Sequence, residues 1–165
     1  MTIETRIRPV ETTRTAPLFD IVVDLNRPVR FGDDGPLGRR VLYGAAGGSF
    51  QGPRLRGEVV AGGGDWALHR PDGTMLLDVR LTLRTDDGES LLMTYQGRWV
   101  IPPDVRTEMA DPATRHRIDP ARYYFRTNPL FETGSTRYAW LNDIVTVGTG
   151  YLVDGGVAYH VEHVL

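Results

Sequence analysis

The stretch that decides the fold reads TMLLDVRLTLRTDDGESLLMTY and occupies residues 74–95. Between Leu77 and Leu83 every second residue is aliphatic, and the residues between them are charged or carry a hydroxyl. A period of two is typical of a strand with one buried face. Asp87-Gly88 then gives a strong signal for a tight hairpin turn, and a second apolar stretch follows it. This part of the chain therefore predicts an antiparallel hairpin.

Similar short stretches recur on both sides of this hairpin, separated by turn signals such as those at 71–73 and 154–156. The 19 Gly and 11 Pro residues favour short strands over long helices. The other strands are predicted at residues 19–25, 40–50, 55–60, 123–127, 138–147 and 157–164. We expect an all-β fold, a single antiparallel β-barrel of about eight to ten strands, because closure removes exposed edges. The barrel is expected over residues 18–165, after a lead-in or edge strand at residues 1–17.

Short sequence signals predict local departures from regular strands at three places. Asp111-Pro112 and Asp119-Pro120 each resemble a helix N-cap followed by proline, so one or two short helical turns are expected between 102 and 122. Gly47-Gly48 predicts a bend within a strand. The glycine run at 62–64 predicts positive φ angles or a close backbone approach just before Asp65.

The composition removes several kinds of chemistry. All 19 basic residues are arginine, and cysteine is absent. Schiff-base lysines, thiolate nucleophiles, disulfides and cysteine-built metal sites are thereby excluded. His160 and His163 fall on opposite faces of a strand, and no serine lies in a nucleophile elbow. We therefore expect no metal and no cofactor, and acid–base chemistry carried by the protein's own side chains.

Charge and hydropathy bear on partners and location. The net charge is −2 and no basic block stands out, so we expect no nucleic-acid partner. No signal segment or apolar stretch of about 20 residues is found, which predicts a cytoplasmic protein with no membrane partner. A homodimer or higher homo-oligomer remains open, with Val157, Tyr159 and Val161 as residues that could seal it.

Several short motifs occur together in a characteristic order. They are Gly47-Gly-Ser-Phe50-Gln-Gly-Pro53, Gly63-Gly-Asp65-Trp66, Pro71-Asp-Gly73, Tyr123-Tyr-Phe-Arg126, Phe131-Glu132-Thr-Gly134 and Tyr138-Ala-Trp140-Leu-Asn142. In order and spacing the sequence resembles the family known as domain of unknown function 3237, over residues 18–165. The resemblance implies a compact β-barrel of the calycin-like or allene-oxide-cyclase-like kind. It implies no settled activity.

The candidate catalytic residues are Asp65, Glu132 and Arg80. A carboxylate in an apolar cavity has its pKa raised toward neutrality, so Asp65 or Glu132 could serve as a general base. Arg80 could stabilise negative charge that develops on a substrate. The alternative is that these charged groups form buried salt bridges that hold the corners of the barrel.

The candidate substrate-binding residues combine aromatic rings with a few polar groups, as small-molecule pockets do. They are Trp66, Tyr124, Arg126, Tyr138, Trp140 and Asn142. On a strand over 138–147, Tyr138, Trp140 and Asn142 would share one face. The alternative for Trp66 and Trp140 is that they belong to the core.

The leading hypothesis is a small-molecule-binding barrel that acts as a cofactor-independent acid–base enzyme. Such a lyase, isomerase or cyclase would act on a small oxygenated aromatic or polyketide-like substrate. Two alternatives stay open. One is a ligand-binding protein without catalysis, and the other is a structural oligomeric module whose barrel interior is filled.

Overall fold

The computed structural model of the protein describes residues 4–33 and 35–165. Ten strands form one sheet in the described part of the chain. They are β1 (Thr15–Leu25), β2 (Val29–Arg30), β3 (Arg39–Gln51), β4 (Arg56–His69), β5 (Met75–Thr85), β6 (Ser90–Val100), β7 (Tyr124–Thr127), β8 (Leu130–Glu132), β9 (Thr146–Val153) and β10 (Gly156–Val164). Of the lead-in expected at residues 1–17, residues 1–3 lie outside the described part, residues 4–14 are exposed, and β1 begins at Thr15.

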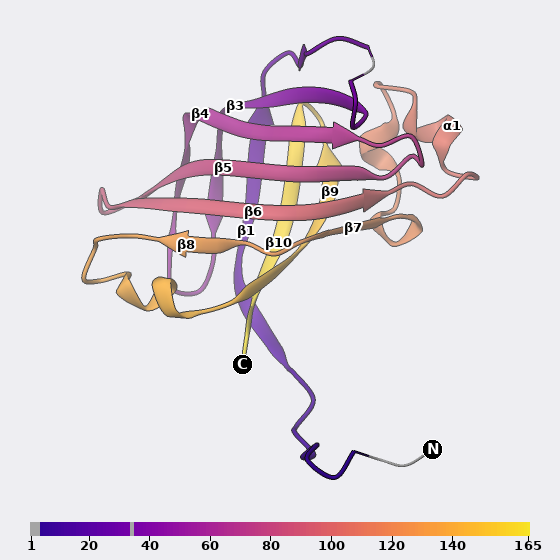
Figure 1. Ribbon diagram of the computed structural model, residues 1–165. Helices are drawn as coiled ribbons and strands as arrows, with labels where there is room; N and C mark the ends of the chain where they lie inside the picture. The colour runs from indigo at the N-terminus through magenta and orange to yellow at the C-terminus, as the bar shows by residue number, and fades with distance from the viewer. Residues whose placement is uncertain (1–3, 34) are drawn as a thin grey trace.

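The sheet closes on itself. Its strand order is β1-β10-β9-β7-β6-β5-β4-β3, and pairing between β1 and β3 completes the ring. All of these pairings are antiparallel, and β8 pairs with β6 beyond the end of β7. In Figure 1, β4, β5 and β6 run across the view while β1 and β10 cross behind them. The predicted single antiparallel barrel is confirmed.

Glycines create the bends that closure needs. The β3–β4 register shifts between Gly44 and Ser49, and the β4–β5 register shifts between Val60 and Gly64. Gly48 has φ +136°, and a Cβ there would lie 2.1 Å from the Val22 carbonyl oxygen. The predicted bend at Gly47-Gly48 is therefore confirmed, because only glycine permits this approach of β3 to β1.

The glycine run at 62–64 also has the predicted positive φ angles. A Cβ on Gly64 would lie 2.4 Å from the Tyr43 carbonyl oxygen, and one on Gly63 would lie 2.3 Å from that of Arg80. One expectation was wrong here. The strand expected at 55–60 does not end at the glycines, because β4 continues through them to His69.

The hydrophobic core fills the barrel near one end. We call this the closed end; it carries the β3–β4 and β5–β6 turns. There the Phe19 ring packs against those of Phe50 and Phe131, at centroid distances of 5.5 and 5.7 Å. Fully buried Leu141 belongs to η3, a 3-10 helix over Ala139–Asp143 at this end. The opposite end, which carries the β4–β5 and β9–β10 turns, we call the open end.

The strand expected at 138–147 does not form. The segment instead holds η3, and β9 begins only at Thr146. The Asn142 amide oxygen accepts from the Thr133 N–H at 2.9 Å, and its NH₂ donates to the Thr133 carbonyl at 3.0 Å. These bonds hold the segment against the backbone that follows β8, nine residues earlier, and favour η3 over a strand.

The crossover between β6 and β7 contains α1 (Arg106–Met109), η1 (Arg115–Arg117) and η2 (Pro120–Arg122). Helical turns are present as predicted, and Asp119 caps η2 by accepting from the Ala121 N–H at 2.9 Å. The N-cap expected at Asp111 was wrong, because η1 begins at Arg115 after Thr114. Three turns lie here and η3 adds a fourth, which exceeds the one or two expected.

The residues suggested as a dimer seal lie inside the barrel. Val157, Tyr159 and Val161 are buried on β10, so that suggestion was wrong. The three residues are two apart along β10, so the pleat turns all of them toward the same, inward face. Within the described residues, no helix has the length and apolar character needed to cross a membrane.

Candidate functional site

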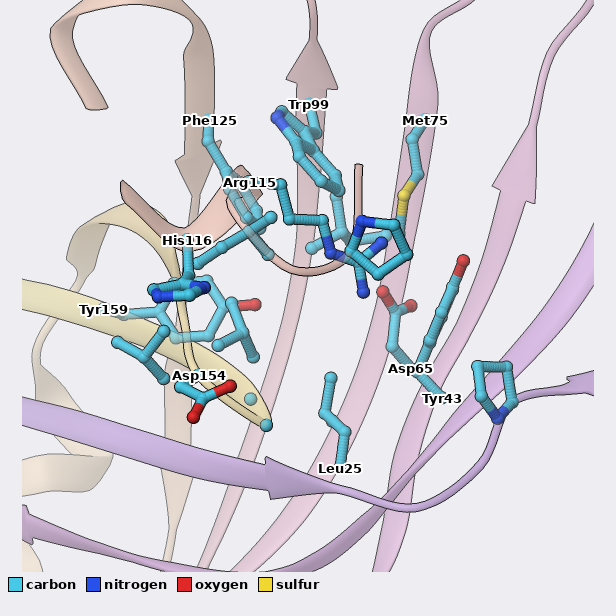
Figure 2. A pocket seen from close by; sticks show the side chains of 18 of the residues that line it. Leu25, Tyr43, Asp65, Met75, Trp99, Arg115, His116, Phe125, Asp154 and Tyr159 are labelled. Atoms are coloured by element: carbon cyan, nitrogen blue, oxygen red, sulfur yellow. The ribbon is translucent and has the colours of Figure 1, made fainter. Parts of the chain in front are cut away.

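A cavity of about 240 Å³ occupies the open end of the barrel. Its apolar and aromatic lining includes Leu25, Tyr43, Met75, Leu77, Trp99, Phe125, Leu152, Val157 and Tyr159. Its polar lining includes Asn26, Asp65, Arg115, His116 and Asp154. Figure 2 shows the two sides of this cavity, with Asp65 and Tyr43 on one and Tyr159, His116 and Asp154 on the other. The interior is therefore not filled throughout, as a purely structural module would have required.

Asp65 reaches the cavity because of its register in the sheet. It pairs with Val79 on β5 and with Tyr43 on β3. Directly paired residues share a face of a sheet, and Val79 is buried in the interior. The glycine bulge just before Asp65 sets this register, so the local sequence positions the carboxylate.

The surroundings of Asp65 favour its protonated form. Burial raises the pKa of Asp65 to about 7, more than offsetting the opposing effect of the hydrogen bond from the Asp78 backbone. That N–H donates to Oδ1 at 2.9 Å. The negative charge of Asp78 adds to the rise in pKa, and the positive charge of Arg40 opposes it. No ion pair to Asp65 is found in the described chain. A carboxyl group of this kind can take up and release a proton near neutral pH.

Two groups beside Asp65 can hydrogen-bond as neutral species. The Tyr43 hydroxyl lies 3.2 Å from His69 Nε2. Burial raises the pKa of Tyr43, and burial lowers the pKa of His69. At neutral pH we therefore expect a phenol beside an uncharged imidazole.

The aromatic wall is held in a fixed arrangement. Trp99 stacks on Phe125 at 5.1 Å, and Phe125 meets Tyr159 edge to face at 5.5 Å. Tyr159 in turn meets Tyr95 at 5.4 Å. Burial raises the pKa of both tyrosines, and the nearby charge of Asp65 raises it further. A Cβ on Gly150 would lie 2.7 Å from the Phe125 ring, so the glycine leaves room for this wall.

Of the nine predicted site residues, Asp65 lines this cavity and the others do not. Arg80 is exposed on the outer face of β5 and pairs with Asp78 at 3.0 Å. Trp66 follows Asp65 and so faces outward, where it borders a shallow exterior hollow with Arg80. Tyr124 and Arg126 lie on the outer face of β7, with the guanidinium 5.4 Å from the ring.

The remaining four predicted residues lie at the closed end. Glu132 is exposed on β8. Tyr138 donates to Asp87 Oδ1 at 3.0 Å, and Arg54 lies 3.7 Å above the Trp140 ring. Asn142 makes the bonds to Thr133 described above. The shared face expected for Tyr138, Trp140 and Asn142 was wrong, because η3 replaces the strand.

Most of the residues that surround Asp65 were not predicted from the sequence. Tyr43 and Trp99 lie on strands, and extending the alternation of buried residues along β3 and β6 could have placed them. Arg115 and His116 belong to η1, and no signal in the sequence indicates that this turn lies over the barrel. Among the described residues no three His, Asp or Glu side chains gather as metal ligands; His160 instead contacts Asp20 at 2.8 Å.

Fold and cavity together define a closed antiparallel β-barrel with an aromatic-walled pocket at one end. The chain belongs to the family described as Protein of unknown function (DUF3237), whose defining pattern matches residues 13–164. It is 33% identical over 130 residues to a UPF0311 protein from Clostridium acetobutylicum, which covers 79% of this chain and 80% of that protein.

Solved structures of similar proteins share the fold. A protein of unknown function from Rhodopseudomonas palustris gives a TM-score of 0.85 at 27% identity, covering 94% of this chain and 100% of that one. A beta-barrel like protein from Acinetobacter baumannii gives 0.82 at 29% identity, covering 95% and 99%. A chain described as an enzyme from Penicillium herquei gives 0.69 at 22% identity, covering 96% and 98%; this likeness extends to the fold alone.

Proposed function

We propose that the protein is an acid–base enzyme that acts on a small oxygenated molecule in the open-end cavity, with Asp65 as the proton carrier. One observation carries this proposal: an unpaired carboxyl group lines an aromatic-walled cavity and has a pKa near 7. At that pKa a substantial fraction of the carboxyl groups is ionised at neutral pH, and the group is still basic enough to accept a proton.

The proposed chemistry begins with proton abstraction. Asp65 removes a proton from a carbon next to a carbonyl group, and the electron pair of the broken C–H bond moves to the carbonyl oxygen. The hydroxyl of Tyr43 or Tyr159 donates a hydrogen bond to that oxyanion. Asp65 then returns the proton to another atom in an isomerisation, or to a leaving group in an elimination. In a cyclisation the enolate carbon instead attacks a second carbonyl carbon of the same molecule, whose C=O π bond becomes an alkoxide that Asp65 protonates. Isomerase, lyase and cyclase therefore share this first step.

The size and lining of the cavity limit the substrate. About 240 Å³ is below the range of about 300–1,000 Å³ that holds drug-sized ligands. Trp99 and Phe125 provide flat apolar walls on which a ring or conjugated system can stack. A single-ring aromatic or polyketide-like substrate fits both constraints.

A ligand-binding protein without catalysis is the second candidate, and the aromatic walls favour it as much as they favour an enzyme. Binding alone does not need a buried, unpaired carboxylate, which costs folding free energy when it is ionised. Asp65 therefore favours the enzyme. The likeness to an enzyme from Penicillium herquei is compatible with this choice but supplies no residue-level support.

Hydrogen–deuterium exchange tests the proposal without knowledge of the natural substrate. A panel of cyclic 1,3-diketones and hydroxyaryl ketones is incubated with the protein in D₂O, and loss of the acidic C–H signal is followed by NMR. We expect the wild type to accelerate exchange of at least one compound. The Asp65→Asn variant should lose about 10²-fold or more of that acceleration.

The matched control is Arg80→Gln, which removes a charge from the outer face and should leave exchange unchanged. Equal exchange by wild type and Asp65→Asn would overturn the proposed role of Asp65. If compounds from the panel bind and none exchanges faster than in buffer, the non-catalytic binding protein is the better account.

A further inference from the structure

We infer that the ligand of the open-end cavity is a small organic carboxylate, whose negative group is held by arginines at the rim while its ring enters the aromatic-walled interior. This inference rests on the site of the proposed function and names its substrate class.

Three arginines from separate segments meet on one side of the rim. Arg30 ends β2, Arg39 begins β3 and pairs in register with His69, and Arg115 begins η1. Arg115 itself lines the cavity. Arg39 lies beside His69, whose Nε2 is 3.2 Å from the Tyr43 hydroxyl. Arg30 pairs with Val41, two residues before Tyr43 on β3. The positive charges of all three arginines counteract the rise in the pKa of Tyr43.

Arg30, Arg39 and Arg115 form no ion pair in the described part of the chain, whereas seven other arginines pair with Asp or Glu. The whole protein has a net charge of −2, so this side of the rim is a local concentration of positive charge. Such a concentration at the mouth of a cavity attracts anions.

The two acidic residues that line the cavity, Asp154 and Asp65, lie away from these arginines or deeper inside. Asp154 lies on the side of Tyr159, opposite Tyr43, as Figure 2 shows. Asp65 lies inside the cavity and is largely buried, so part of its population is uncharged at neutral pH. An anion at the arginine side of the rim is therefore attracted by these arginines, and the acidic residues that line the cavity lie farther from it.

The chemistry of the groups favours a carboxylate. A guanidinium group can donate two parallel hydrogen bonds to the two oxygens of a carboxylate. Arg115 is exposed, and within the described chain its guanidinium is free of ion pairs, so it can turn toward such a ligand. With the carboxylate at the rim, the ring lies between Trp99 and Leu25, and its acidic proton faces Asp65. The same arginines also counter the negative charge that develops when Asp65 abstracts that proton.

Matched ligand pairs test this inference. Dissociation constants are measured by isothermal titration for a panel of single-ring carboxylates, including 4-hydroxybenzoate, and for the corresponding uncharged amides. We expect at least one carboxylate to bind about tenfold or more tightly than its amide, since charge-assisted hydrogen bonds are worth about 1.5–3 kcal/mol. The preference should shrink as the salt concentration rises.

Substitutions of the rim arginines test whether they cause the preference for carboxylates over amides. Arg115→Gln should reduce the carboxylate-to-amide ratio to about threefold or less, and Arg39→Gln should reduce it in part. Arg126→Gln, on the outer face of β7, is the control and should leave the ratio unchanged. A panel in which no carboxylate binds better than its amide would overturn the inference, as would an unchanged ratio in Arg115→Gln.

Asp65→Asn separates this inference from the proposed function. The variant should keep the preference for carboxylates, or increase it, because it removes a negative charge from the cavity. If the preference persists while exchange is unaffected by Asp65→Asn, the inference stands and the proposed function fails. If exchange is lost in Asp65→Asn and no carboxylate is preferred, the proposed function stands and the inference fails.

Discussion

The two ends of the barrel place carboxylates in opposite circumstances. At the closed end, Asp87 accepts hydrogen bonds from Thr85 at 2.6 Å and Tyr138 at 3.0 Å, and Arg137 lies 2.7 Å away. The Thr85 and Tyr138 hydroxyls and the Arg137 charge hold the pKa of Asp87 below its usual range. At the open end, Asp65 has one hydrogen bond from the backbone, and burial raises its pKa to about 7.

This difference separates a carboxylate that its neighbours hold ionised from one that the proposed proton transfer can use. A carboxylate surrounded by donors stays ionised and fixes the turn that carries it. A carboxylate that faces a cavity with few donors keeps a proton that it can exchange. Tyr138, one of the candidates from the sequence, is a donor to a carboxylate of the first kind, and Asp65 belongs to the second kind.

The largest expected effect comes from cutting the closed-end core. Phe131→Ala removes a buried ring that packs against Phe19 at 5.7 Å. We expect a loss of about 3–5 kcal/mol in the free energy of unfolding, measured by urea denaturation at pH 7. Ligand binding at the open end should survive in the folded fraction. A loss below about 1 kcal/mol would show that the Phe131 ring contributes little to the packing of the closed end.

The second effect concerns the open end and depends on pH. An aspartate in the unfolded chain has a pKa of about 3.9, and Asp65 in the folded protein has one of about 7. Between these values the folded state binds the proton more tightly, so the Asp65 contribution to stability falls as pH rises from about 4 to about 7. Above about pH 7 it changes no further.

Asp65→Asn cannot ionise and escapes this penalty. Three pKa units correspond to about 4 kcal/mol at most, so we expect the variant to exceed the wild type by about 1–4 kcal/mol at pH 8. Near pH 4 the two proteins should differ little. The measurement is urea denaturation of both proteins across this range, and a wild type that gains stability relative to Asp65→Asn as pH rises would contradict the account.

A smaller effect is expected from Tyr138→Phe at the closed end. The change removes the hydroxyl that donates to Asp87 and leaves the ring in place. We expect a loss of about 1–2 kcal/mol in thermal or urea unfolding, because a hydrogen bond to a charged group is lost. Proton exchange should be unaffected. A loss of exchange in Tyr138→Phe would mean that the closed end takes part in the chemistry.

The smallest effect is expected from Arg80→Gln on the outer face. Arg80 and Asp78 form an exposed ion pair, and pairs of this kind contribute about 0–1 kcal/mol. We therefore expect a change in unfolding free energy within about 1 kcal/mol, and unchanged ligand affinity by isothermal titration. A marked loss of affinity would restore Arg80 to the site.

Much of the fold followed from the sequence, since alternation along residues 77–83 and the glycines at 47–48 and 62–64 predict strands and bends by local physics. The same alternation placed Arg80 opposite the aliphatic face, so its outward position was implied by the pattern that built the hairpin. The segment at 138–147 could not be predicted this way, because the bonds between Asn142 and Thr133 that favour η3 depend on tertiary placement.

The candidate site was less predictable than the fold. Asp65 was identified as a candidate because it directly follows the glycine run at 62–64. Arg115 reaches the rim through a long crossover whose path depends on packing over the whole barrel. Hydrophobic periodicity and secondary-structure propensity do not indicate where such a crossover runs. The arginines at the rim could therefore be found only in the structure.

A site-resolved titration of Asp65 tests the central claim most directly. The carboxyl carbon is followed by ¹³C NMR from pH 3 to pH 9, and its signal is assigned by its disappearance in Asp65→Asn. The account predicts a midpoint near pH 7 for Asp65 and a midpoint below the usual range for Asp87 in the same spectra. A midpoint for Asp65 below about pH 5, within the ordinary range of aspartate, would contradict its role as a proton carrier.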